Sequence, residues 1–346
     1  MSDYARILMT GATGFVGRWL RPALKAAYPE AAFAALLHRP SETVPGWTTF
    51  CVDLVNAEAA REAIRIWKPD LVVHLAAQSS AGQSYDLAEQ TWRTNTVGAL
   101  NLATAVRRHV PEATVFNVST GEVYGSTFLK GPASETSPVS PKSIYARSKA
   151  AAEAIFEDLL PRETHLVTVR PLNHTGAGQD ERFVLPSFAA QIARIEAGLE
   201  PARLQVGNIE VERDFLDVRD VVDAYLLILA QAKSLTPRAV FNVASGQPRR
   251  IADLLDVMLH ASNLPLQVEV DPNRFRPAEI PRVVGDAGAL RRSFGWAPRR
   301  SVNELVEGLL AYWRERISSE AIREVAGGLK AASCDEADPN RSGPEF

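Results

Sequence analysis

Residues 5–17 read ARILMTGATGFVG, a short apolar run that ends in three glycines spaced three residues apart. In such a turn Gly11 permits the tight bend, Gly14 lets the backbone approach a pyrophosphate, and Gly17 allows the next helix to pack on the strand. The start of that helix offers free N–H groups and the positive end of its dipole to phosphates. The stretch predicts the first strand, phosphate-binding turn and first helix of a dinucleotide-binding domain, although a purely structural turn can also use three glycines.

Short apolar segments alternate with helical patterns through the first half of the chain. The longer apolar segments are almost purely hydrophobic, as are parallel strands that are buried on both faces. Alternating strands and helices imply right-handed crossovers, so we predict an α/β fold with a doubly wound parallel sheet, a Rossmann fold. The expected strands are 5–10, 32–37, 48–52, 71–75, 114–118 and 165–170, and the expected helices are 16–27, 57–67, 87–108 and 143–159.

The pattern changes after Pro171, where we expect a loop and then a smaller lobe. We predict residues 1–172 as the dinucleotide-binding domain, with segments around 216–245 returning to it, residues 173–325 mainly as a substrate-binding lobe, and residues 326–346 as a disordered tail. The elements expected in this half are helices 183–197, 218–232, 251–261 and 302–316, a polar hairpin at 204–215, and strands 239–243 and 267–270.

The composition is that of an ordinary globular protein. The chain has 346 residues, 46% of them hydrophobic and 23% charged, with a net charge of -3. This balance gives no electrostatic case for binding nucleic acid, and no apolar run approaches the ~20 residues of a membrane span. The N-terminus shows no export signal, and Cys51 and Cys334 are too few for a disulfide scaffold or an all-cysteine zinc site. We expect a cytoplasmic protein without a metal site.

The end of the second strand selects between the two nicotinamide cofactors. An acidic residue there would hold the ribose 2′-hydroxyl of NAD, but the sequence has Leu37-His38-Arg39 instead. Arg39, helped by His38, can pair with a 2′-phosphate, so NADP(H) is favoured and NAD(H) stays open, as does a plain solvated basic turn. Asp53, followed by Leu54, is placed to accept from the adenine amino group, or to cap the next helix.

Tyr145 and Lys149 lie four residues apart inside a predicted helix, so they share one face of it. The preceding strand ends in Ser119-Thr120, and ligands of doubly wound sheets collect at such strand ends. A tyrosine titrates near ~10, and an ammonium beside it favours phenolate character and proton transfer at neutral pH. Thr120 can donate to a substrate oxygen. We predict a catalytic set of Thr120, Tyr145 and Lys149; the alternative is a helix-surface pair and a loop threonine.

Together these motifs resemble the extended short-chain dehydrogenase/reductase family over about residues 5–320. The second half resembles the GDP-mannose branch. It carries the run Arg170-Pro171-Leu172-Asn173-His174-Thr175-Gly176-Ala177-Gly178-Gln179, which looks like the nucleotide-sugar loop of that branch, and a second similar run that begins at Arg213-Asp214-Phe215-Leu216-Asp217. It is more similar to GDP-4-keto-6-deoxy-D-mannose reductases than to GDP-mannose 4,6-dehydratases, in which Trp-Gly-His follows that Arg-Asp pair. One departure is Leu172, where phenylalanine is usual.

The resemblance implies a cofactor site and a sugar-nucleotide site, with Arg213 and Arg276 clamping the diphosphate, Glu279 on a ribose hydroxyl and Asn173 between sugar and phosphate. Surface salt bridges are the alternative for the arginines. The implied cofactor residues are Gly11, Thr13, Gly14, Phe15, Val16, Gly17, His38, Arg39, Asp53, Leu54, Leu75, Ala76, Ala77, Gln78, Asn95, Val118, Ser119, Tyr145, Lys149, Leu172 and His174. The implied substrate residues are Ser79, Ser80, Gln83, Thr120, Glu122, Asn173, Val184, Gly207, Arg213, Arg276 and Glu279.

Three functions fit these residues. The first is NADPH-dependent reduction of the C4 keto group of GDP-4-keto-6-deoxy-D-mannose, with GDP-D-rhamnose as the expected product and the stereochemistry at C4 left open. The second is a 4,6-dehydratase or epimerase, in which Glu122 would be the base near C5. The third is a non-catalytic, NADP-sensing binding protein on the same fold.

A homodimer is the expected assembly. In the family that the chain resembles, helices such as 87–108 and 143–159 pair across a two-fold axis into a four-helix bundle. Ala146, Ala150, Ala151 and Ala154 form a stripe of small residues that allows close approach of a partner helix. The same stripe would also suit packing against the chain's own sheet.

Overall fold

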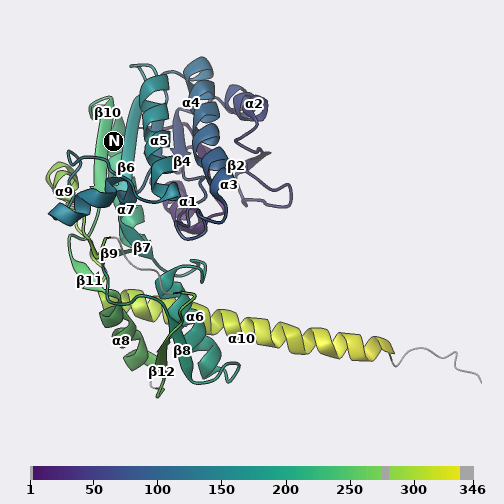
Figure 1. Cartoon of the computed structure of the whole chain (residues 1–346). Helices are drawn as coiled ribbons and strands as arrows, with labels where there is room; N and C mark the ends of the chain where they lie inside the picture. The colour runs from purple at the N-terminus through teal and green to yellow at the C-terminus, as the bar shows by residue number, and fades with distance from the viewer. Residues whose placement is uncertain (1–2, 263, 275–279, 336–346) are drawn as a thin grey trace, which may run out of the picture.

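The computed structural model describes residues 3–262, 264–274 and 280–335 (Figure 1). Its centre is a seven-stranded parallel sheet with the strand order β10-β6-β5-β4-β1-β2-β3. The predicted doubly wound parallel fold is therefore confirmed. The strands are β1 (Arg6–Thr10), β2 (Ala32–Leu37), β3 (Thr48–Cys51), β4 (Leu71–His74), β5 (Thr114–Val118), β6 (His165–Pro171) and β10 (Arg238–Val243).

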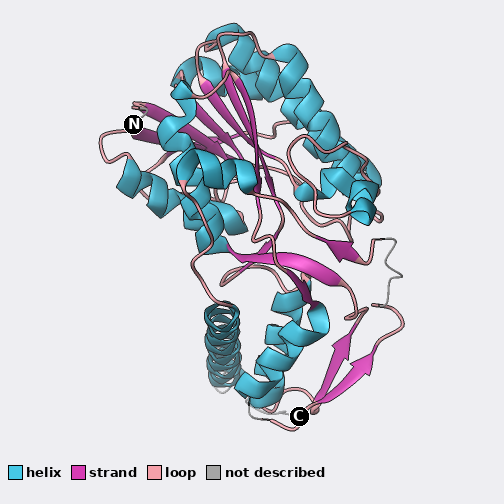
Figure 2. Ribbon diagram, turned by 90° about the vertical axis from the view of Figure 1, so that its left-hand side faces the viewer, coloured by secondary structure: helices cyan, strands magenta, loops and turns pink. Residues whose placement is uncertain are grey.

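Helices cover both faces of this sheet (Figure 2). Along β1, Ile7 and Met9 belong to one hydrophobic cluster and Leu8 to the other, because successive side chains of a strand point to opposite faces. The first cluster packs against α1 (Phe15–Ala27) and α7 (Val218–Gln231). The second packs against α2 (Ala57–Trp67), α4 (Gly98–His109) and α5 (Ile144–Leu159).

The expected helix 87–108 is interrupted rather than uniform. It consists of α3 (Ala88–Trp92), a π-helical turn (Arg93–Val97) and α4. The π turn carries Asn95, which is buried and hydrogen-bonded to both backbone groups of Gln78. A π-helical turn holds one residue more than an α-helical turn, and here it places the Asn95 side-chain amide beside the loop that follows β4.

Later parts of the chain return to the first lobe. β10 lies at the edge of the central sheet, in register with β6, and α7 packs beside α1. Leu290 of α9 (Gly288–Phe294) and Trp296 also belong to the first core cluster. The division between the lobes thus crosses the sequence several times.

The second lobe packs three helices around a third hydrophobic cluster: α6 (Val184–Glu196), α8 (Ile251–Ser262) and α10 (Val302–Asp335). β8 (Arg203–Val206) pairs in parallel with β12 (Gln267–Val270). A separate small sheet joins β9 (Glu212–Asp217) to β7 (Asn173–Thr175), β11 (Pro248–Arg250) and β13 (Arg282–Val283).

The predicted hairpin at 204–215 is wrong, because its two halves join different sheets. The segment after β8 packs against the loop that follows β12 instead of turning back along β8. The two backbones approach so closely that a Cβ built on Gly207 would lie 2.5 Å from the carbonyl oxygen of Arg274. The Asp271 N–H also donates to the carbonyl of Val206, at 2.9 Å. Contacts with this distant segment give β8 its partner.

The helix α10 continues to Asp335, beyond the point at which the sequence predicts a tail. Residues 326–335 include three alanines, a leucine and a lysine, which are strong helix formers, and the helix continues through Gly327 and Gly328. The remainder of the predicted tail, residues 336–346, lies outside the described residues.

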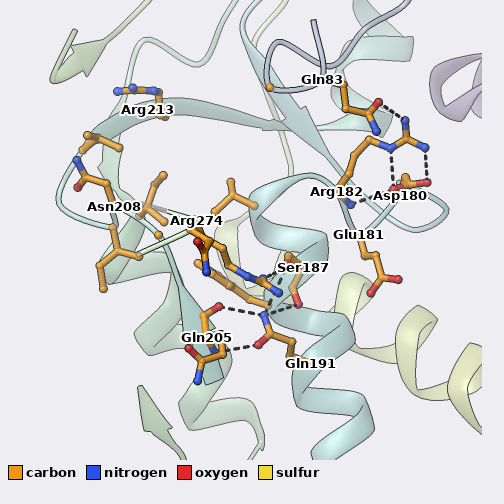
Figure 3. A pocket seen from close by; sticks show the side chains of 18 of the residues that line it. Gln83, Asp180, Glu181, Arg182, Ser187, Gln191, Gln205, Asn208, Arg213 and Arg274 are labelled. Carbon is orange, nitrogen blue, oxygen red and sulfur yellow. Dashed lines mark hydrogen bonds and ion pairs between the residues drawn. The ribbon is translucent and has the colours of Figure 1, made fainter. Parts of the chain in front are cut away.

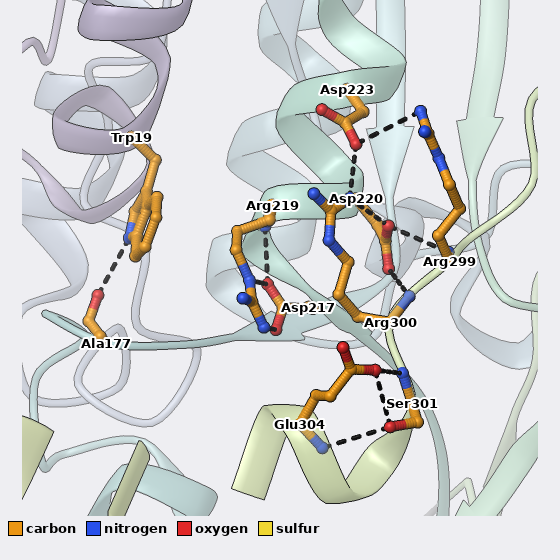
Figure 4. A network of polar contacts seen from close by, with 10 residues as sticks. All are labelled: Trp19, Ala177, Asp217, Arg219, Asp220, Asp223, Arg299, Arg300, Ser301 and Glu304. Carbon is orange, nitrogen blue, oxygen red and sulfur yellow. Dashed lines mark hydrogen bonds and ion pairs between the residues drawn. The ribbon is translucent and has the colours of Figure 1, made fainter. Parts of the chain in front are cut away.

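A polar network joins the two lobes where α7 meets the segment before α10 (Figure 4). The carboxylate of Asp220, which is 1% exposed, accepts the backbone N–H groups of Arg299 and Arg300 at 3.0 and 3.1 Å and the Arg300 guanidinium at 2.7 Å. Ser301 and Glu304 then exchange hydrogen bonds at the start of α10. Because α10 packs on α6, this network fixes the second lobe to the first.

Candidate active site

The glycine turn after β1 has the shape that a dinucleotide needs. Gly11 has a φ of +68°, and a Cβ there would lie 2.8 Å from the Ala76 nitrogen. A Cβ on Gly17 would lie 2.4 Å from the Gly11 carbonyl oxygen, so only glycine allows α1 to pack this closely. Among the described residues, a Cβ on Gly14 would come close only to the Gly11 carbonyl oxygen, at 3.2 Å, so the outer side of the turn is open. The turn therefore fits a pyrophosphate at the start of α1.

A cavity of about 280 Å³ opens beside this turn at the carboxyl ends of β1, β4, β5 and β6. It brings together most of the predicted site residues from segments that are far apart in sequence. Those that line it are Gly11, Gly14, Phe15, Val16, Gly17, Leu75, Ala76, Ala77, Ser79, Val118, Ser119, Thr120, Glu122, Tyr145, Lys149, Leu172, Asn173 and His174.

The predicted catalytic residues meet in this cavity. The Ser143 hydroxyl caps α5 by accepting the Ala146 N–H at 3.0 Å, and this sets Tyr145 in the first turn and Lys149 one turn later. Both side chains are buried, with 8% and 3% of their surface exposed. Lys149 Nζ donates to the carbonyl of Val118 at 2.7 Å, and Tyr145 shares a hydrogen bond with Thr120. The three side chains are therefore held in one place by the ends of β5 and α5.

Burial governs the protonation of these groups. It raises the pKa of Tyr145 well above its usual value, and the nearby Glu122 carboxylate raises it further, while the Thr120 hydrogen bond opposes the shift. Burial lowers the pKa of Lys149 to about 8, against the opposing effect of Glu153. The sequence argument expected phenolate character at Tyr145. In the protein alone Tyr145 is instead a protonated donor, because loss of solvent disfavours its anion.

Glu122 lies between the catalytic cavity and the second lobe. Burial raises the pKa of its carboxyl group, while the Arg213 guanidinium and a hydrogen bond from Ser143, at 3.4 Å, lower it. Burial also lowers the pKa of Arg213, against the opposing effect of the Glu122 carboxylate. An acid and a guanidinium therefore face each other across the route between the lobes.

A buried polar network that the sequence did not reveal supports the catalytic helix from behind. Glu153, one turn after Lys149, forms an ion pair with Arg170 at 2.6 Å and accepts a hydrogen bond from Ser119. Arg170 also donates to the Tyr124 hydroxyl at 3.0 Å. The four-residue spacing from Lys149 to Glu153 was the available signal, but Arg170, the partner of Glu153, comes from β6, the strand that follows α5.

A second cavity, of about 850 Å³, lies in the other lobe and is lined by four arginines (Figure 3). Three of them have acidic partners: Arg182 pairs with Asp180, Arg194 with Glu181, and Arg274 with Asp271. Arg213 instead donates to the carbonyl oxygens of Glu212 and Pro281, at 2.8 and 3.2 Å. Arg213 is thus a cation without a salt bridge among the described residues, which suits an anionic ligand. Predicted residues that line this cavity are Gln83, Val184, Gly207 and Arg213.

Several predicted site residues line neither cavity. Asn95 bonds to Gln78 and to the Ser148 hydroxyl, and Ser80 accepts from the Gln83 N–H. Thr13 and Leu54 also lie outside both linings, whereas Arg276 and Glu279 lie outside the described residues.

The predicted adenine end of the site is exposed and lies beyond the two cavities. His38, Arg39 and Asp53 follow β2 and β3, which are neighbours in the sheet. Asp53 is not the cap of α2, since that cap is Asn56. Instead, Asp53 accepts the Val55 N–H at 3.0 Å, in a turn that leaves its carboxylate exposed.

Four residues of the catalytic cavity were not among the predicted site residues: Pro171 at the end of β6, and Gln179, Phe183 and Val283 from the second lobe. Gln179 and Phe183 follow β7 in a loop, and Val283 is in β13. No spacing relates them to the glycine turn or to the helix of Tyr145. Only the folding of the second lobe against the first brings them to the cavity.

Comparison with known proteins places the chain among enzymes of nucleotide-sugar chemistry. The family model described as GDP-mannose 4,6 dehydratase matches residues 8–309. The chain is 34% identical to GDP-6-deoxy-D-mannose reductase of Pseudomonas aeruginosa, over 91% of this chain and 99% of that protein. It is 33% identical to GDP-mannose 4,6 dehydratase 2 of Arabidopsis thaliana, over 81% of this chain and 75% of that one.

Solved structures agree with this relation. The structure of RMD from Pseudomonas aeruginosa complexed with NADPH aligns with a TM-score of 0.77 and 34% identity, over 90% of this chain and 99% of that one. Among the described residues, no helix combines the length and apolar character that crossing a membrane requires.

Proposed function

Because this chain belongs to the GDP-mannose 4,6-dehydratase family, we propose that it is the reductase of that chemistry: an NADPH-dependent oxidoreductase that reduces the C4 keto group of GDP-4-keto-6-deoxy-D-mannose. The expected product is a GDP-6-deoxyhexose, GDP-D-rhamnose. The observation that carries this proposal is the meeting of Thr120, Tyr145 and Lys149 in the cavity that also contains the glycine turn. The named reductase relative, aligned over nearly its whole length, supports the same reaction.

The chain's own residues provide the acid and the orientation for this reduction. When bound, NADPH would supply the hydride that C4 of the keto sugar receives. Tyr145, whose raised pKa keeps it protonated, gives its proton to the oxygen at C4 as negative charge develops there. Thr120 holds the same oxygen by donating its hydroxyl hydrogen, and the Lys149 ammonium stabilises the tyrosinate that remains. The ketone thus gains one hydride and one proton and becomes an alcohol.

The two lobes divide the binding work. We assign the first lobe, residues 1–172 with the returning segment 216–245, to NADPH, and residues 173–325 mainly to the sugar nucleotide. Arg39 would contact the 2′-phosphate, since a guanidinium is a good partner for phosphate oxygens. Arg213 would contact the diphosphate of the sugar nucleotide, because it lines the second cavity and forms no salt bridge within the described part of the chain.

The second candidate is a 4,6-dehydratase, and Glu122 is the residue that favours it. A dehydratase needs a base near C5, and Glu122 lines the catalytic cavity two residues after Thr120. Burial raises the pKa of the Glu122 carboxyl group, which keeps more of it protonated and makes the remaining carboxylate a stronger base.

One experiment separates these functions. Purified protein is incubated with NADPH and enzymatically made GDP-4-keto-6-deoxymannose, and the sugar is identified by NMR. The reductase consumes one NADPH per sugar and yields a 6-deoxyhexose. Consumption of GDP-mannose without added NADPH would establish the dehydratase instead, and binding of NADPH with no conversion of either sugar would indicate a non-catalytic binding protein.

We further propose a homodimer in which α3, α4 and α5 pair with the same helices of a second copy. Trp92 and Leu100 are 39% and 41% exposed, and Thr96 lies between them on the same face of the α3–α4 helix. Of the alanine stripe, Ala146 is buried within its own chain, whereas Ala154 is exposed. The face available to a partner therefore combines Ala154 with the apolar stripe of the neighbouring helix.

A cytoplasmic location agrees with the free, exposed thiol of Cys51.

A further inference from the structure

Gln179 has no role in the reaction described so far, yet it lines the catalytic cavity together with Thr120, Tyr145 and Lys149. It lies in the loop between β7 and α6, directly before Asp180 and Arg182 of the second cavity. Its side chain is 6% exposed. It is therefore a buried amide at the passage between the two proposed binding regions.

The orientation of this amide follows from its one hydrogen bond. The Gln179 side chain meets the backbone carbonyl of His174 at 3.2 Å. A carbonyl oxygen can only accept, so the group that faces it must be the NH₂ group, Nε2. The other end, Oε1, is buried and has no hydrogen-bond partner in the part of the chain that the structure describes. Gln179 thus holds an unused acceptor beside the cavity.

His174, whose carbonyl accepts the hydrogen bond of the Gln179 amide, is itself held in place. The His174 ring stacks on Phe15, with the ring centres 6.2 Å apart and the planes 10° from parallel. Its Nδ1 lies 2.9 Å from the Leu172 carbonyl, and burial lowers the pKa of the ring, so the ring is neutral and donates through Nδ1. Contacts from Phe15 at the start of α1 and from Leu172 directly after β6 therefore hold His174, whose carbonyl orients Gln179.

The chemistry of a buried acceptor limits what can satisfy it. Ionised phosphates have no hydrogen to donate, so neither the cofactor pyrophosphate nor the sugar diphosphate can be its partner. The remaining donors are the ribose hydroxyl groups, the carboxamide of the nicotinamide and the hydroxyl groups of the hexose, and only the last two belong to the groups that react. A buried acceptor that gains a hydrogen bond only in the complex contributes to binding, because its unpaired state is unfavourable.

We propose that Gln179 is a positioning residue whose Oε1 accepts a hydrogen bond from an N–H or O–H donor of the reacting pair. That donor is either the carboxamide N–H of the nicotinamide or a hydroxyl of the hexose. The inference rests on the proposed function, since it requires both ligands to meet at this cavity.

The test compares two variants with a matched control. Gln179→Leu removes the acceptor, and Gln179→Asn withdraws it by one methylene while keeping an amide. Thr175→Val is the control, because the Thr175 hydroxyl is also buried without a partner among the described residues but lines neither cavity. Melting temperatures establish that each variant is folded.

Binding constants for NADPH and for reduced 3-acetylpyridine adenine dinucleotide phosphate, which lacks the carboxamide N–H, are then measured by fluorescence. If the donor is the carboxamide, the Gln179 variants bind NADPH about tenfold more weakly, bind the analogue as before, and no longer discriminate between them. If the donor is a hexose hydroxyl, NADPH binding is unchanged and KM for the keto sugar nucleotide rises by a similar factor. In both cases Thr175→Val behaves as the wild type.

Unchanged cofactor discrimination together with unchanged KM in both folded variants would overturn the proposal. Failure of the wild-type protein to bind NADPH at all would instead refute the proposed function and the role of Gln179 along with it. The two failures are therefore distinguished by the wild-type measurement.

Discussion

Tyr145 is the residue on which turnover depends most in the proposed reduction. We expect Tyr145→Phe to lower kcat by ~10²–10⁴-fold while NADPH binding stays nearly unchanged, because the change removes the acid and little contact area. The matched control is Tyr225→Phe, which removes another buried hydroxyl that has no partner among the described residues. Steady-state kinetics and fluorescence titration measure the two effects. More than a tenth of wild-type turnover in Tyr145→Phe would exclude Tyr145 as the main acid.

Lys149 sets the expected pH dependence. Burial lowers its pKa to about 8, so the ammonium is intact below that pH and is lost as the pH rises through it. The proposed reaction needs this charge beside Tyr145, so kcat/KM should be constant below about pH 8 and fall above it. A pH profile of kcat/KM checks this. A profile that stays level to pH 10 would mean that the ammonium form of Lys149 is not required.

Arg39 should determine the choice of cofactor. Arg39→Asp replaces a partner of the 2′-phosphate with a carboxylate that repels it and can accept from a 2′-hydroxyl, so preference should shift from NADPH toward NADH. Arg108→Asp is the control, because α4 ends near the amino edge of the sheet, opposite the site. The ratio of kcat/KM for the two cofactors is measured. An unchanged ratio would show that Arg39 does not read that phosphate.

Local spacing made some site residues predictable and left others hidden. The glycine turn and the Tyr145–Lys149 pair depend on neighbours within one turn of chain, so their pattern is visible in the sequence. Gln179 reaches the cavity only because the loop after β7 packs against the glycine turn, where Trp19 Nε1 of α1 donates to the Ala177 carbonyl at 2.9 Å. Contacts of that range leave no periodic signal.

At the scale of elements, the exposed stripe on α3 and α4 predicts the effect of interface changes. The double variant Trp92→Glu with Leu100→Glu should shift sedimentation from a dimer to a monomer, because two charges would be buried in an apolar contact. Leu129→Glu, at a position that is 60% exposed outside these helices, is the control and should leave the dimer intact. Equal sedimentation of the double variant and the wild type would place the interface elsewhere.

The elements themselves show where sequence patterns are sufficient. The inner strands β1, β2 and β4 of the central sheet are largely apolar on both faces, which makes them recognisable without knowledge of their partners. The short strand β8 has little such signal, and its partner β12 lies beyond α8 in the chain. The sequence therefore predicted that β8 forms a hairpin with the segment that follows it, whereas in the structure β8 pairs with the distant strand β12. The π turn at Arg93–Val97 was also missed, since the helical pattern continues through it.

At the scale of the molecule, Asp220 is expected to be a major contributor to stability. Asp220→Ala removes the acceptor of two backbone N–H groups and of the Arg300 guanidinium. Hydrogen bonds to a buried charge contribute about 1.5–3 kcal/mol, so we expect a loss of that order in the free energy of unfolding. Glu62→Ala, which breaks an exposed pair with Arg65, should change the free energy of unfolding far less. Urea denaturation measures both, and equal losses would contradict the role given to the network.

The place of β10 in the central sheet affects how the protein is made. The strand that covers the edge of β6 is synthesised only after α6, β8 and β9 of the second lobe. Until then the nascent first lobe carries a bare, apolar strand edge, of the kind that pairs with other chains. A ribosome that stops before residue 238 therefore releases an aggregation-prone fragment, and protection of that edge during translation becomes a condition for a good yield of this enzyme.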